Sequence, residues 1–248
     1  APDDGLSAED LLKHADIAMY RAKQTGRNGY HVFTHDLAQS NKTEMAIEQA
    51  LHLAFKRNGL QMFYQPKVNL ETRQVLGFEA LIRWFDPVHG AIAPDRFIPM
   101  AETTGYIIQL GEWVLRQACS DMQVLRMESG QDYRVSVNVS PRQLEHPGFI
   151  TMIQSILDST GLPPRALELE ITEGMLVSQS GTLLSKLNAL HAMGVLLTID
   201  DFGTGYCSLS YVAQYPIDVI KIDRCFIDVN QKTSRAIVGA ITTIAHGL

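Results

Sequence analysis

The sequence predicts an α/β fold in which a mainly parallel sheet is covered by helices, an arrangement that a barrel would satisfy. Two observations lead to this prediction. From about residue 43, short apolar segments rich in β-branched residues alternate with helical patterns. Polar side chains also recur where successive apolar segments end. Because parallel strands end at the same edge of a sheet, a barrel can assemble a site there from residues far apart in the sequence.

The first 34 residues contain one helical pattern and one short apolar segment. A cap-like Ser7 precedes the helical pattern, Gly26 is expected to end it, and residues 30–33 are expected to form a strand. One helix and one strand cannot bury a core of their own. We therefore interpret this segment as the tail of something larger.

The remaining chain alternates strand and helix patterns. Since six strands are two short of a closed eight-stranded barrel, we expect the last two strand–helix units to be absent from this sequence. The predicted strands are 61–68, 75–84, 134–139, 167–172, 195–200 and 219–223, and the predicted helices start at about Thr43, span 112–127, 149–159 and 182–193, and start again at about Ser234.

Composition is that of an ordinary globular protein, with 46% hydrophobic and 19% charged residues and a net charge of −6. This negative charge argues against a polymeric nucleic acid as partner, although a site that holds metal could still attract a small phosphate ligand. No apolar run approaches the roughly 20 residues of a membrane-spanning helix, and no signal peptide opens the chain. We expect this fragment to be cytoplasmic and to make no contact with a membrane. This expectation leaves room for a membrane anchor in another part of the parent protein.

Five strands carry a polar side chain near the same end. Acidic groups brought together in this way repel one another, and a divalent metal is the simple remedy. Oxygen ligands without Cys or His favour Mg²⁺ or Mn²⁺ over zinc. A cap, a turn or a salt bridge explains each residue alone, but not the repeated placement. The residues are Glu79, Asn138, Glu170, Asp200 with Asp201, and Lys221.

Strand alternation adds neighbours to this set. Glu79, Leu81 and Arg83 share one face of their strand, which places a carboxylate in line with a guanidinium that could hold a phosphate. Glu168 shares a face with Glu170, but we do not assign it to the site.

From about residue 43 to its end the chain resembles the EAL domain family, whose motifs it carries in order. They are Tyr64-Gln65-Pro66, residues 79–84 (EALIRW), Asn138-Val139-Ser140, residues 168–173 (ELEITE), residues 200–205 (DDFGTG) and Lys221-Ile222-Asp223. EAL domains are phosphodiesterases that hydrolyse cyclic di-GMP, a bacterial second messenger, to linear pGpG with Mg²⁺ or Mn²⁺. The resemblance implies a TIM-type (β/α)8-like barrel with an antiparallel first strand.

The resemblance also implies roles, with one or two metal ions. Glu79, Asn138, Glu170 and Asp200 would hold the first ion, and Asp200 and Asp201 would contribute to the second. Lys221 would act in catalysis beside the reacting water and the scissile phosphate. Gln65, Leu81 and Arg83 would contact cyclic di-GMP, and Glu173 would brace the loop after the paired aspartates.

Two departures from the family pattern stand out. Cys207 occupies a position where the family usually has Ser, a small change. The family also carries a Glu needed for metal binding and catalysis on its seventh strand and a Gln-Gly motif near its eighth, and neither lies within this sequence.

Residues 15–23, followed by Gly26-Arg27-Asn28, resemble the last helix and turn of GGDEF domains, the diguanylate cyclase family. The match excludes that family's signature loop, so it implies no cyclase activity. The predicted organisation is a GGDEF remnant at 1–34, a linker at 35–42 and a C-terminally incomplete EAL domain at 43–248.

Two other functions stay open beside the hydrolase. Whether the protein forms a homodimer also stays open. An inactive cyclic di-GMP receptor is typical of EAL domains that have lost metal ligands, whereas each ligand that can be checked is present here. A barrel lyase or aldolase using Lys221 as a Schiff base would leave Arg83 and the paired aspartates unexplained. We favour the hydrolase.

Overall fold

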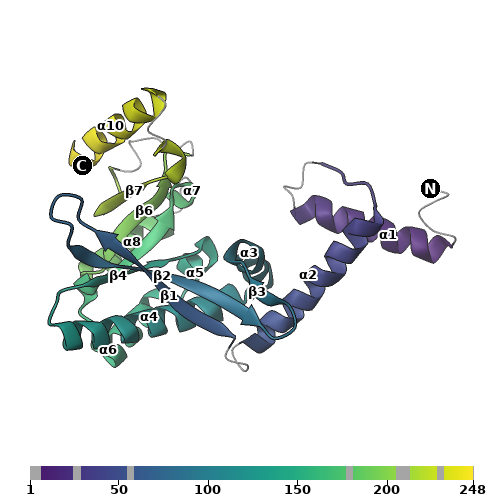
Figure 1. Ribbon diagram of the computed structural model, residues 1–248, viewed down its shortest axis with the longest axis horizontal. Helices are drawn as coiled ribbons and strands as arrows, with labels where there is room; N and C mark the ends of the chain where they lie inside the picture. The colour runs from purple at the N-terminus through teal and green to yellow at the C-terminus, as the bar shows by residue number, and fades with distance from the viewer. Residues whose placement is uncertain are drawn as a thin grey trace. The chain divides into compact units, whose positions relative to one another are not determined.

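The computed structural model describes residues 7–24, 29–54, 59–176, 181–204, 213–227 and 232–247 (Figure 1). The chain divides into two compact units. The first comprises Ala1–Gly59 and Trp84–Met100, and the second comprises Leu60–Arg83 and Ala101–Leu248. Gly26, expected to end the first helix, and Cys207 lie outside the described residues.

The first unit contains helices α1 (Ala8–Gln24) and α2 (His35–Ala54) and the short strand β3 (Gly90–Ile92). The Ser7 cap is confirmed, because its Oγ accepts a hydrogen bond from the Asp10 amide at 3.1 Å. The rings of Trp84 and Phe97, both buried, meet edge to face with centroids 5.5 Å apart.

Two expectations for this unit are wrong. Residues 30–33 form no strand; instead the Phe33 ring stacks on His14 at 3.7 Å between centroids. The helix expected from about Thr43 begins at His35, because the Thr34 hydroxyl caps it by accepting from the Leu37 amide at 3.1 Å. Residues 35–42, predicted as a linker, are therefore helical, and whether they also connect two domains stays a prediction.

The second unit is built on the sheet, and the six predicted strands are present. Among the described residues the sheet has seven strands in the order β1-β2-β4-β5-β6-β7, with β3 paired to the end of β2. The adjacent pairs β2–β4, β4–β5, β5–β6 and β6–β7 are all parallel. The strands are β1 (Leu60–Val68), β2 (Val75–Asp86), β4 (Arg134–Asn138), β5 (Leu167–Thr172), β6 (Leu196–Phe202) and β7 (Val219–Ile222).

Strand β1 forms a hairpin with β2. The turn between them is closed by hydrogen bonds from the Asn69 amide to the Gln74 carbonyl and from the Arg73 amide to the Asn69 carbonyl, both 2.9 Å. A connection this short joins only antiparallel neighbours. The strand order and directions therefore agree with the predicted α/β class, including its antiparallel first strand.

Helices follow the parallel strands, as the alternating pattern predicted. Helix α4 packs on β4 and on α6 (Figure 1). None of the helices in the described ranges has the length and apolar character needed to cross a membrane. The helices are α3 (Pro94–Thr104), α4 (Ile107–Ser129), α5 (Pro141–Glu145), α6 (Phe149–Thr160), α7 (Glu173–Leu176), α8 (Gly181–Ala192) and α10 (Lys232–Gly247), with short 3-10 turns at Pro164–Ala166 and Arg224–Phe226.

The two faces of the parallel sheet differ in chemistry. Val137 and Leu169 are register partners and belong to the hydrophobic core beneath the helices. One residue earlier on each strand, Ser136 and Glu168 are also partners and are buried, yet polar. Because strand side chains alternate, one face supplies the core and the other supplies a polar interior.

Leu169→Ala tests the packing on the core face. Leu169 is 1% exposed, so the cavity should lower the free energy of unfolding by about 2–5 kcal/mol. Urea unfolding followed by circular dichroism measures the change. Met127→Ala on α4, at a position 76% exposed, is the control and should leave the midpoint nearly unchanged. Equal losses in the two variants would contradict this packing.

Candidate metal centre

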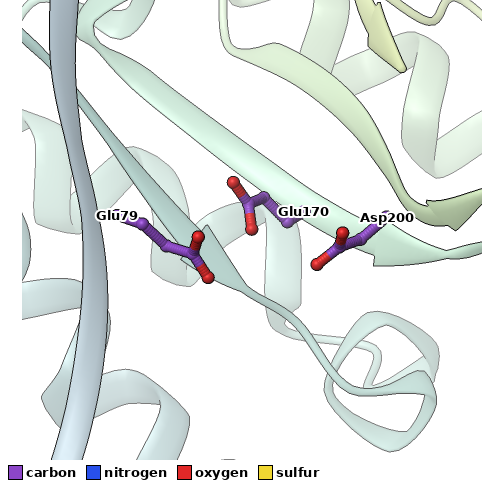
Figure 2. A group of neighbouring side chains, drawn as sticks. All are labelled: Glu79, Glu170 and Asp200. Atoms are coloured by element: carbon purple, nitrogen blue, oxygen red, sulfur yellow. The ribbon is translucent and has the colours of Figure 1, made fainter. Parts of the chain in front are cut away.

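Three carboxylates from different strands meet at one point on the polar face. Glu79 lies on β2, Glu170 on β5 and Asp200 on β6, and Figure 2 shows their side chains pointing toward one another. One oxygen atom of each lies within 4.8 Å of the others. The predicted convergence of these residues on one point is thus found in the structure.

Lys221, on β7, brings an ammonium group into the same cluster. Its Nζ donates to Glu170 Oε2 at 2.6 Å, to Asp200 Oδ2 at 3.0 Å and to Glu79 Oε2 at 3.2 Å. Burial acts to lower the pKa of Lys221, but the hydrogen bonds and charges of these carboxylates outweigh it and raise the pKa. A lysine held as a cation is a poor amine nucleophile, which disfavours the Schiff-base alternative.

Asn138 completes the group that sequence reasoning selected. It is the last residue of β4, and its Nδ2 donates to Glu79 Oε1 at 3.0 Å. The carbonyl oxygen of the same amide is an acceptor suited to a hard cation. A parallel register places Asn138 directly beside Glu170.

Burial controls the electrostatics of Glu170. This side chain is 0% exposed, and burial raises its pKa against the opposing effect of Lys221. Its Oε1 is buried without a hydrogen bond. The carboxylate therefore has capacity for a further positive partner.

The paired aspartates lie at an irregularity in β6. The register shifts between Ile199 and Phe202, and Asp201 has a φ of 55°, in the left-handed region that Asp adopts more readily than most residues. The Asp200 side chain joins the carboxylate cluster, whereas Asp201 is exposed and lies close to Asp223. Burial, followed by the charges of Asp200 and Asp223, raises the pKa of Asp201. The three-carboxylate cluster does not include Asp201.

Glu173 lies just after β5 and is 4% exposed. Its Oε2 accepts a hydrogen bond from the Gly203 amide at 2.8 Å. Gly203 has a φ of 98°, a conformation that favours glycine. The contact ties the backbone that follows the paired aspartates to the end of β5.

The predicted substrate contacts lie on β1 and β2, outside the carboxylate cluster. Arg83 is half-buried, donates to the Ile82 carbonyl at 2.9 Å and places its guanidinium carbon 5.9 Å from the centre of the Phe63 ring. By strand alternation Leu81 shares the face of Glu79, and Gln65 shares the face of Phe63.

The sequence reasoning missed Lys67 and set Glu168 aside. Lys67 Nζ lies 2.8 Å from Glu168 Oε1 and 3.7 Å from Glu170 Oε1. A signal was present, because Lys67 lies two residues after Gln65 and so shares its face of β1. Nothing local indicated that this face reaches β5.

The residues present fit a divalent cation. Among the described residues, two ammonium groups, Lys67 and Lys221, contact four carboxylates: Glu79, Glu168, Glu170 and Asp200. In formal charges this leaves two negative charges in excess, which one divalent cation would balance. One oxygen of each of Glu79, Glu170 and Asp200 lies within 4.8 Å of the others, and this donor set contains neither Cys nor His, which suits a hard cation such as Mg²⁺.

Known proteins resemble this chain over most of its length. The family model described as EAL domain matches residues 48–248. The bifunctional diguanylate cyclase/cyclic di-GMP phosphodiesterase MucR of Pseudomonas aeruginosa is 40% identical over 249 residues, which cover 100% of this chain and 36% of that protein. The cyclic di-GMP phosphodiesterase NbdA of the same organism is 39% identical over 226 residues, 91% of this chain and 29% of that protein.

The fold has solved counterparts. A structure described as the PaMucR phosphodiesterase in complex with c-di-GMP aligns with a TM-score of 0.77 and 40% identity, over 80% of this chain and 81% of that one. This chain spans about a third of the length of the two curated relatives. The family model covers most of the sequence, and the aligned structure shares its α/β architecture. The chain therefore belongs to the EAL domain family.

Proposed function

We propose that this chain hydrolyses cyclic di-GMP to linear pGpG and requires Mg²⁺ or Mn²⁺. The observation that carries the proposal is the meeting of Glu79, Glu170 and Asp200 within 4.8 Å, with Lys221 donating to all three. The names of the relatives MucR and NbdA include cyclic di-GMP phosphodiesterase, which supports this substrate.

The metal would be held by Glu79, Asn138, Glu170 and Asp200, and Asp201 would contribute to a second ion. When bound, such ions acidify water and neutralise charge that develops on a phosphate. Glu173 would hold the backbone after the paired aspartates in place through the Gly203 amide.

The remaining roles belong to residues beside the cluster. Lys221, a cation held by three carboxylates, would stabilise negative charge on the scissile phosphate and orient the attacking water. Arg83 would hold a phosphate, since a guanidinium binds two oxygens at once. Gln65 and Leu81 would contact the ligand from β1 and β2.

The proposal is tested by incubating the full-length protein that carries this chain with cyclic di-GMP and Mn²⁺. We expect pGpG to accumulate and EDTA to stop its formation, with products separated by chromatography. Folded protein that forms no pGpG with either Mn²⁺ or Mg²⁺ would refute the hydrolase.

The same preparation separates the enzyme from a cyclic di-GMP receptor. Binding measured with Ca²⁺ in place of Mg²⁺ gives the affinity without turnover. A receptor binds equally well with no metal and never turns over, whereas the proposed enzyme needs metal for product formation.

Glu79→Ala should abolish turnover with little loss of stability. Glu79 supplies a proposed metal ligand, while its side chain is partly exposed and its contacts lie within the site, to Asn138 and Lys221. Activity and thermal unfolding are measured together, with Glu128→Ala on an exposed turn of α4 as control. A much lower unfolding temperature of Glu79→Ala in metal-free buffer would show that Glu79 is structural.

Lys221→Met should lower kcat by about a hundredfold or more, because it removes a cation beside the reacting phosphate. It also leaves three carboxylates without their shared partner, which should reduce the free energy of unfolding in EDTA by about 3–5 kcal/mol. Adding Mn²⁺ should restore much of this stability. Urea unfolding with and without Mn²⁺ measures the effect, and identical curves for variant and wild type in EDTA would contradict it.

Several further assignments are also proposals. We infer a GGDEF remnant at residues 1–34 and an EAL domain from residue 43; the match to MucR, whose name includes diguanylate cyclase, over the whole chain supports the first. A cytoplasmic location, a homodimer and the preferred metal stay predictions.

A further inference from the structure

Glu168 is a buried acid that the proposed chemistry does not use. It is 3% exposed on β5, and its Oε1 accepts hydrogen bonds from Thr198 Oγ1 at 2.6 Å and from Lys67 Nζ at 2.8 Å. An ionised carboxylate buried at this depth needs such partners, because desolvation otherwise costs several kcal/mol. Lys67 is therefore the counter-ion of Glu168.

Lys67 reaches Glu168 from a strand that is not its neighbour. Lys67 lies on β1, and the sheet order separates β1 from β5 by β2 and β4. The contact therefore crosses the polar face rather than following the hydrogen bonds of adjacent strands. It links the antiparallel strand to the parallel strand that carries Glu170.

The same ammonium group also faces the proposed metal ligand. Lys67 Nζ lies 3.7 Å from Glu170 Oε1, an oxygen that is buried and accepts no hydrogen bond. The other oxygen, Oε2, accepts from Lys221 at 2.6 Å. The two lysines thus lie against the two oxygens of one carboxylate.

We propose that Lys67 is a positioning residue of the metal centre, anchored on Glu168 and orienting Glu170 through its Oε1. Glu168 and Glu170 are two residues apart on one strand and share its face, so one ammonium group can contact both. Thr198, which is the register partner of Glu170, donates to the same oxygen of Glu168 as Lys67 does. This inference rests on the proposed function only in taking Glu170 as a metal ligand.

Positioning and simple electrostatics predict opposite outcomes. A positive charge close to a metal ligand repels a cation, so removing Lys67 would tighten metal binding if charge alone mattered. If Lys67 instead orients Glu170, removing it weakens binding, since partners that orient metal ligands are typically worth about 10–100-fold in metal affinity.

The test measures Mn²⁺ binding without substrate, by electron paramagnetic resonance of free Mn²⁺, in the full-length protein. The first variant, Lys67→Met, keeps the length of the side chain and removes its charge. The second, Lys67→Met with Glu168→Gln, removes one positive and one negative charge together, so no unpaired buried carboxylate remains and the net charge near the metal is unchanged. Lys13→Met, at an exposed position of α1, is the control.

We expect both Lys67 variants to bind Mn²⁺ about tenfold or more weakly than wild type, and the control to match wild type. The Mn²⁺ concentration for half-maximal activity should rise by a similar factor, with kcat at saturating Mn²⁺ changed much less. If the Lys67→Met protein does not fold, the Mn²⁺ affinity of the double variant decides whether Lys67 positions Glu170. Unchanged or tighter Mn²⁺ binding in the double variant, at an unfolding temperature close to that of wild type, would overturn the proposal.

This outcome is independent of the proposed reaction. A wild-type protein that binds Mn²⁺ but forms no pGpG would refute the hydrolase, while the comparison of Mn²⁺ affinities would still decide the role of Lys67.

Discussion

Repulsion among acidic side chains on the polar face of the sheet is the constraint on which the rest of this structure depends. Glu79, Glu170 and Asp200 come from three strands and lie within a few ångströms of one another. Such a group stays fully ionised only with positive charge between its members, because like charges at short range in a partly buried site are strongly unfavourable. Lys221 and Lys67 supply part of that charge, and a divalent cation would supply the remainder.

The fold can hold this cluster because each strand separates two environments. Val137, Leu169 and Leu197 are register partners that face the helices and form the core, while Glu168 and Glu170 face the other way. A slip of one residue in register would put carboxylates into the core and aliphatic side chains into the site. Core packing therefore fixes the positions of the polar groups as well as the stability of the sheet.

The strand ends add local adjustments that regular alternation cannot provide. An ideal strand would turn Asp200 and Asp201 to opposite faces. Here Asp200 shares the polar face of Thr198 and joins the cluster, while the register shift in β6 and the left-handed backbone of Asp201 bring Asp201 close to Asp223. Glu173 fixes the following turn through the Gly203 amide, so the distortion is held by a side chain of α7, directly after β5. Conformational strain of this kind is retained where a site needs it.

The sequence by itself determined the α/β class, six strands, most of the helices and the residues that meet in the cluster, because apolar periodicity and strand-end polarity are local properties. Residues 30–33 show the limit of such patterns, since a strand needs a partner that a short segment cannot specify. Only the tertiary structure decided that Lys221 bridges three carboxylates and that Lys67 crosses from β1 to Glu168 on β5. Those contacts depend on distances between strands that are not neighbours, and these distances follow from the packing of the whole sheet.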